Sequence, residues 1–158
     1  PAAVVQAVQG EGHRLAARLQ LGAGFRVSEV LGLNRASLQG ETRDPVSGRW
    51  AGLVEVVGKG GFGRVQYVPL EDYRALAAHL EEHRGGLAVQ YKAYLADLHR
   101  AADAVGEAWA GTHALRHNYV RSFLMEAAGA GLGADAMMRE AMARVGHHRM
   151  SEVRTYCR

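Results

Sequence analysis

Cysteine, proline and lysine are all scarce in this chain of 158 residues. It contains one cysteine, three prolines and two lysines, against seventeen arginines. A single cysteine excludes an internal disulfide bond and is typical of a reducing cytoplasm. No apolar run approaches the length that spans a bilayer, and the first residues do not resemble a signal peptide. The sequence therefore predicts a cytoplasmic protein with no membrane partner.

What the chain does contain is typical of one globular domain with a real core. Hydrophobic residues make up 48% of it and charged residues 22%, which excludes a disordered segment. The formal net charge of +3 mildly favours an anionic partner. The chain begins at Pro1 and stops two residues after Tyr156. From these ends we predict that residues 1–158 form one domain of a longer protein.

The spacing of apolar residues predicts a mostly helical α+β domain with one small antiparallel sheet. Two β-prone runs, 53–57 and 64–68, flank a glycine-rich turn and predict a hairpin. Residues 40–49 are rich in turn formers. Helical periodicity marks the remaining segments. These are 3–21 with an interruption at two glycines, 26–33, 71 up to Gly85, 91–105, 115–127, 137–145 and a short stretch at 150–156.

A histidine and an arginine near the start of one predicted helix are suited to phosphate chemistry. His113 and Arg116 are three residues apart, so a helix places them on one face, which we expect to differ from the core-facing stripe that contains Leu115. Arginine can bind two phosphate oxygens at once, and histidine can move a proton near neutral pH. The alternative is a helix start with two solvated polar residues, which is commoner for this motif taken alone.

Two further cations lie upstream at positions that glycines make accessible. Arg26 follows Gly24 at the start of a predicted helix, where the helix dipole disfavours a cation. Glu29, three residues on, either pairs with it at the surface or orients it. Lys59 occupies the hairpin turn between glycines, where it could reach a phosphate and donate a proton. An ordinary solvated turn lysine is the alternative.

The last part of the chain holds a histidine and a tyrosine that could complete such a site. His147 and Tyr156 are nine residues apart, so one straight helix would turn them to opposite sides and the chain must turn between them. A tyrosine needs neighbouring cations to act as a nucleophile at neutral pH. Spacing alone leaves His148 as a competitor of His147, and a packed C-terminal aromatic as the alternative for Tyr156.

Four boxes of the sequence, in order, resemble the catalytic domain of the tyrosine recombinases, the phage-integrase family. They span nearly the whole chain. The boxes are the first-arginine box at 24–31, the lysine hairpin at 58–61 followed by 68–70, the H-x-L-R-H box at 113–117, and Gly146-His147 followed by Tyr156. The gap between the third and fourth boxes is longer than is common in the family.

The resemblance implies the role of each residue. Tyr156 would attack a DNA phosphate and form a 3′-phosphotyrosine link, while Lys59 protonates the leaving 5′-oxygen and His113 assists proton transfer. The charge on phosphorus would be stabilised by Arg26, Arg116 and His147, with Glu29 and His117 in support. The resemblance implies no metal and no other cofactor. Double-stranded DNA is the implied partner, with a synaptic tetramer of the full-length protein at the nucleoid.

Three other readings of the function stay open at this stage. A type IB topoisomerase would use the same chemistry without pairing two sites. A non-catalytic DNA-binding module would keep the fold alone, and a generic helical protein would carry the motifs by coincidence. The family usually has an N-terminal DNA-clamping domain and often a C-terminal tail, and residues 1–158 match neither. We therefore expect this part of the protein alone to bind DNA weakly, as a monomer.

Overall fold

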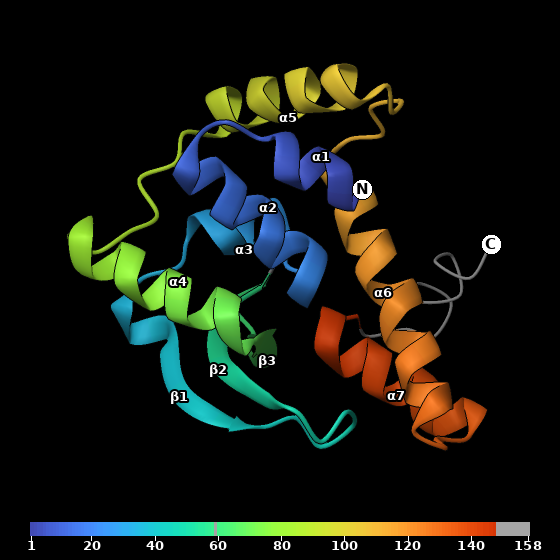
Figure 1. Cartoon of the computed structure of the whole chain (residues 1–158). Helices are drawn as coiled ribbons and strands as arrows, with labels where there is room; N and C mark the ends of the chain where they lie inside the picture. The colour runs from blue at the N-terminus through green and yellow to red at the C-terminus, as the bar shows by residue number, and fades with distance from the viewer. Residues whose placement is uncertain (59, 148–158) are drawn as a thin grey trace.

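A computed structural model describes residues 1–58 and 60–147 of the chain. Within these ranges the domain is mostly helical with one small sheet, as the sequence predicts (Figure 1). The helices are α1 (Ala2–Ala7), α2 (Glu11–Ala23), α3 (Val27–Leu31), α4 (Leu70–Glu82), α5 (Tyr91–Val105), α6 (Thr112–Gly129) and α7 (Ala134–Val145), with a 3₁₀ turn at Arg35–Ser37. The strands are β1 (Leu38–Arg43), β2 (Trp50–Val57) and β3 (Gly63–Pro69).

The three strands form an antiparallel sheet in the order β1-β2-β3. Strands β2 and β3 pair without interruption from Ala51 opposite Pro69 to Val57 opposite Gly63, which confirms the predicted hairpin. Strand β1 was not predicted, and residues 40–43 of the turn-rich segment belong to it. It lies at the edge of the sheet and has no fully buried side chain, so it lacks the alternation of apolar and polar residues that marks a strand in sequence.

The interrupted helical pattern at the N-terminus resolves into two helices joined at Gly10. The carboxylate of Asp97, on α5, accepts hydrogen bonds from the Gly10 N–H at 2.9 Å and from His13 Nδ1 at 2.8 Å. These bonds satisfy polar groups at the start of α2, which no preceding turn of helix can do. The turn between α1 and α2 is thereby attached to α5.

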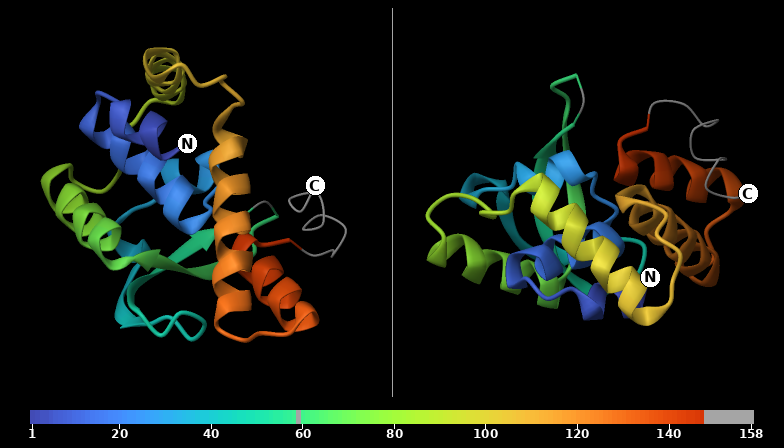
Figure 2. Two further views of the ribbon diagram at one scale, coloured as in Figure 1. Left: turned by 45° about the vertical axis from the view of Figure 1, so that its right-hand side comes forward. Right: turned by 90° about the horizontal axis from the view of Figure 1, so that it is seen from above.

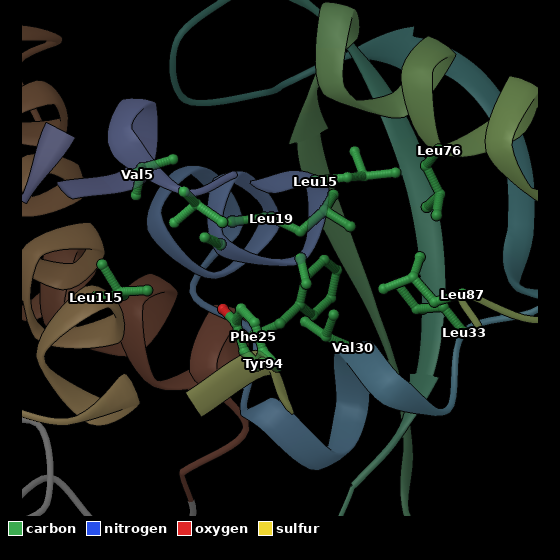
Figure 3. Close-up of a cluster of buried hydrophobic side chains, with 14 of the residues drawn as sticks. Val5, Leu15, Leu19, Phe25, Val30, Leu33, Leu76, Leu87, Tyr94 and Leu115 are labelled. Carbon is green, nitrogen blue, oxygen red and sulfur yellow. The ribbon is translucent and has the colours of Figure 1, made fainter. Parts of the chain in front are cut away.

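Helix α2 lies at the centre of the larger of two hydrophobic clusters. Leu19 is fully buried in this cluster, which also contains Phe25 between α2 and α3, Val30 on α3 and Leu76 on α4 (Figure 3). Truncating such a side chain to alanine costs about 2–5 kcal/mol. A smaller cluster, around Val120 and Phe123, holds α6 against α7.

Helix α6 connects the two clusters. It runs along α2 and then meets α7, which returns beside it toward β3 (Figures 1 and 2). The C-terminal end of α7, the start of α3 and the ends of β2 and β3 near the hairpin turn therefore come to one region. No helix of the described residues is both long and apolar enough to cross a membrane.

Candidate active site

The centre of the site is the carboxylate of Glu29, whose side chain is only 1% exposed. One oxygen, Oε1, accepts a hydrogen bond from Arg26 Nη1 at 3.1 Å. The other, Oε2, accepts one from the Arg26 backbone N–H at 2.7 Å and one from Arg64 Nη2 at 2.8 Å, and it lies 3.9 Å from Arg116 Nη1. One buried negative charge thus faces three guanidinium groups, so the cluster carries an excess of positive charge.

Arg26 lies just before α3, as the N-cap residue rather than in the first turn. Glu29 reaches back to its backbone N–H, the arrangement of a capping box. The same carboxylate also binds the guanidinium of Arg26, which is 29% exposed. The carboxylate is nearly inaccessible to solvent, so of the two alternatives the surface ion pair is wrong, and the one in which Glu29 orients Arg26 fits the geometry.

Gly24 makes room for the second arginine. It ends α2 in the left-handed conformation, with φ of 68°, and any Cβ there would overlap the Tyr119 ring. Its carbonyl accepts a hydrogen bond from Arg116 Nη1 at 2.6 Å. The glycine before Arg26 therefore allows the close approach of α2 and α6 that brings the two arginines together.

Arg116 is buried, with 1% of its side chain exposed. Besides the bond to Gly24 it donates from Nη2 to the Val145 carbonyl at the end of α7. The sequence predicts that the face of α6 with Arg116 points away from the core, and the alternative was that Arg116 is solvated. The burial of Arg116 shows that both are wrong. Helix α6 is covered by α2 on one side and α7 on another, so more of its surface is buried than one apolar stripe indicates.

Three histidines of the predicted set border these arginines. His147 Nε2 lies 3.4 Å from Arg116 Nη2. The rings of His113 and His117 meet edge to face, with centroids 4.9 Å apart. Burial lowers the pKa of His113, and the positive charges of His117, Arg116 and Arg26 lower it further. A neutral imidazole at neutral pH can accept a proton.

A cavity of about 210 Å³ opens on Arg26, His113 and Arg116. Its other walls come from the end of α2, the start of α3 and the start of α6, at Gln20, Phe25, Val27, Ser28 and Thr112. Two guanidinium groups and an imidazole facing one cavity can bind a singly or doubly charged oxyanion and exchange a proton with it.

Arg64 is a member of the cluster that sequence analysis missed. Its side chain, 11% exposed, extends from β3 to Glu29 and to the end of α7. Burial lowers the pKa of Arg64 against the opposing attraction of Glu29, but a guanidinium stays protonated. The sequence placed this position only at the start of the predicted second strand of the hairpin, and an arginine in an arginine-rich chain carries no local signal.

Lys59, His148 and Tyr156 lie outside the described residues. The residue before Lys59 is placed, however. A Cβ atom added to Gly58 would lie 3.6 Å from Glu29 Oε1 and 3.9 Å from Arg26 Nη1. The hairpin box and the first-arginine box therefore adjoin each other in space, although about thirty residues separate them in sequence.

Comparison with solved structures identifies the architecture. The site-specific recombinase XerH bound to its difH substrate superposes with a TM-score of 0.70 over 99% of this chain, at 17% identity. A lambda integrase dimer bound to a COC′ core site gives 0.66 over 98%, at 16% identity, and the Tn1549 transposon integrase in complex with circular intermediate DNA gives 0.59 over 98%, at 20% identity. The chain has the catalytic-domain fold of the tyrosine recombinases.

This fold confirms the predicted fold class, and the resemblance to recombinases now has structural support. The chain spans 48%, 45% and 57% of the lengths of these three proteins. No protein-family model matches the sequence, and no curated protein matches it significantly. With identities this low, the comparisons establish the recombinase fold and leave the chemistry to the site itself.

In this recombinase fold, elements from four separate parts of the sequence meet. Arg26 and Glu29 come from the start of α3, Arg116 from α6, His147 from the end of α7, and Arg64 from β3. Among the residues that the structure describes, no group of three or more histidine, cysteine or acidic side chains is arranged to hold a metal ion. What the described site can supply is positive charge, hydrogen-bond donors and a neutral imidazole.

Proposed function

We propose that the protein cleaves and rejoins DNA strands as a site-specific recombinase or integrase, with Tyr156 as the nucleophile. The observation that carries this proposal is the cluster of three arginines around the single buried carboxylate of Glu29. Burying that much uncompensated positive charge is costly, and a phosphate in the adjoining cavity would offset it. The solved structures of the same fold were determined on DNA.

The proposed reaction replaces one phosphodiester bond with another. The Tyr156 hydroxyl oxygen attacks phosphorus and the bond to the 5′-oxygen breaks, leaving a 3′-phosphotyrosine and a free 5′-hydroxyl. His113, held neutral at neutral pH, accepts the tyrosine proton, and Lys59 gives a proton to the leaving oxygen. A 5′-hydroxyl attacks the phosphotyrosine in the reverse step, so the strand is resealed without an external energy source.

The arginines act on the charge that develops at phosphorus. Arg26 and Arg116 face the same cavity from α3 and α6, so their N–H groups can bind different non-bridging oxygens. The bonds from Arg116 to two main-chain carbonyls, and from Arg26 to Glu29, hold both guanidinium groups in place before the substrate arrives. Donors fixed in advance stabilise a transition state better than donors that must reorganise.

Double-stranded DNA is the proposed partner, bound chiefly through its phosphates. Strand exchange between two sites requires several copies of the full-length protein on DNA, for which we propose a synaptic tetramer. The protein would then act at the nucleoid in the cytoplasm, and a mobile genetic element would encode it. Because phosphate contacts release counterions, we expect binding to weaken steeply with salt.

The test is covalent trapping of the full-length protein on DNA. Nicked duplexes of randomised sequence lose the downstream fragment after cleavage and so prevent resealing. A denaturation-resistant protein–DNA adduct that is absent for Tyr156→Phe would support the proposal. Sequencing the trapped DNA would then give the site, and a requirement for two paired sites would separate a recombinase from a type IB topoisomerase. Salt-sensitive binding without an adduct would indicate a non-catalytic DNA-binding module.

A further inference from the structure

We infer that Arg64 is a positioning residue, which fixes His147 relative to Arg26 and Arg116 by connecting Glu29 to the C-terminal end of α7. Its effect on cleavage rests on the function proposed above, whereas its effect on His147 does not. Arg64 is absent from the cavity that Arg26 and Arg116 line. It therefore acts through its two contacts and not on the substrate.

The two ends of the Arg64 guanidinium bind different elements. Nη2 donates to Glu29 Oε2 at 2.8 Å, and Nη1 donates to the Arg144 carbonyl at 2.6 Å. Glu29 belongs to α3 and holds Arg26, while Arg144 is in the last turn of α7. One side chain on β3 thus joins the helix that carries the first arginine to the helix that leads into His147.

The end of α7 is shaped to receive this side chain. Gly146 is left-handed, with φ of 61°, and its N–H and that of His147 bond back to the carbonyls of Ala143 and Met142. This is a Schellman cap. A Cβ added to Gly146 would lie 2.9 Å from Arg64 Cδ, closer than side chains tolerate. The glycine before His147 therefore lets the chain rest directly on the Arg64 stem.

Arginine suits this position because it presents two donors in one rigid plane. A lysine has a single compact head group and cannot bridge acceptors on two elements in the same way. The Arg64 Nε is buried and has no hydrogen-bond partner among the described residues. The bonds at the two Nη atoms therefore set the orientation of the guanidinium plane. Its charge also adds to the positive excess around Glu29, and a lysine would keep that charge while losing the bridge.

The first experiment separates binding from chemistry in the full-length protein. Arg64→Met and Arg64→Lys would be compared with the wild type in single-turnover cleavage of the nicked duplexes, with DNA affinity measured alongside. We expect the cleavage rate of the bound complex to fall about 10²-fold in Arg64→Met, the size of effect that a misplacement near 1 Å can have. The Kd for DNA should change much less, and Arg64→Lys should recover part of the rate.

Asp97→Asn is the matched control for lost stability. Asp97 is a buried carboxylate that holds the start of α2, and it accepts hydrogen bonds from Gly10 in the α1–α2 turn, His13 on α2 and Arg100 on α5. Rates would be compared at temperatures where all variants are equally folded. The inference would be overturned if Arg64→Met cleaved DNA at the wild-type rate, or if Asp97→Asn lost as much of the cleavage rate. An equal loss of DNA affinity in Arg64→Met would also overturn it.

A second readout needs no cleavage at all. The ring signals of His147, followed by NMR in histidine-labelled protein, report its position beside Arg116. We expect these signals to move in Arg64→Met and to stay unchanged in Asp97→Asn. Unchanged His147 signals in a folded Arg64→Met protein would overturn the inference. If the wild type forms no adduct, the proposed function fails while this measurement still decides the role of Arg64.

Discussion

Two buried carboxylates of this domain, Glu29 and Asp44, each bind arginine, but their charge balance is opposite. Glu29 faces three guanidinium groups. Asp44 binds one, with both of its oxygens 2.7 Å from the nitrogens of Arg144, and that arginine also bonds to Glu140 at 3.0 Å. Cations exceed anions in the first cluster, and anions exceed cations in the second.

The surroundings differ in the same sense. Arg144 lies over the rings of Phe123 and Tyr67, at 4.5 and 4.9 Å. With Asp44 it lines a cavity of about 400 Å³, whose charged lining residues are two arginines and two acids, the others being Arg49 and Glu126. The cavity beside Glu29 is lined by two guanidinium groups and an imidazole, with no carboxylate among the described residues of its lining. The Asp44 cluster, without excess positive charge, fixes α7 against the turn before β2, whereas the excess positive charge around Glu29 attracts an anion. The balance of charge therefore distinguishes the structural cluster from the candidate active site.

The sharpest test of this comparison removes one arginine from each cluster. Arg116→Ala should lower the cleavage rate about 10²- to 10³-fold, the effect of removing a transition-state donor, with a much smaller change in DNA affinity. Arg144→Ala, measured where both proteins are folded, should retain most of the rate. Both substitutions leave buried acceptors unsatisfied, so denaturant unfolding should show that both lose stability. Equal losses of rate and affinity in Arg116→Ala would contradict a transition-state role.

The corresponding carboxylate substitutions should separate stability from activity. Glu29→Gln and Asp44→Asn each remove a buried carboxylate that binds arginine, and each should lower the free energy of unfolding by about 3–5 kcal/mol. Only Glu29→Gln should also slow cleavage at equal folded fraction, since Glu29 holds Arg26. Urea titration and single-turnover cleavage would measure the two effects. A comparable rate loss in Asp44→Asn would remove the distinction between the clusters.

Acid should weaken the Asp44 cluster over a defined range of pH. Burial would raise the pKa of Asp44, but hydrogen bonds from Arg144 and Val46 outweigh it and the pKa is lowered. A carboxyl with a lowered folded-state pKa contributes stability above its unfolded pKa of about 3.9, and this contribution is lost as pH falls through the folded value. Asp44→Asn should therefore show a weaker pH dependence of unfolding below about pH 4. An unchanged slope in that variant would argue against the pair.

The smallest expected effect concerns the pH profile of cleavage. Since the pKa of His113 is lowered, first by burial and then by His117, Arg116 and Arg26, its neutral form should persist below its usual value of about 6.5. The rate should fall only below that pH, as His113 takes up a proton. His117→Gln should move the midpoint upward, and His113→Gln should abolish it. A midpoint unaffected by either change would exclude His113 as the group that titrates.

The sequence by itself determined the periodic helices, the β2–β3 hairpin and the order of the four boxes, because these depend on residues near one another in the chain. Arg26, His113 and Arg116 could be selected from it, since each lies in a local motif with a chemical meaning. Their roles, with those of Lys59, His147 and Tyr156, stay predictions.

Only the tertiary structure decided which groups surround Glu29. Strand β1 exists through pairing with β2 rather than through its own pattern. Arg116 is buried because α2 and α7 both cover α6, which the periodicity of α6 alone does not show. Arg64 reaches Glu29, thirty-five positions earlier in the chain, and Arg144, eighty positions later. Such contacts depend on how distant elements pack, and no local pattern of residues encodes them.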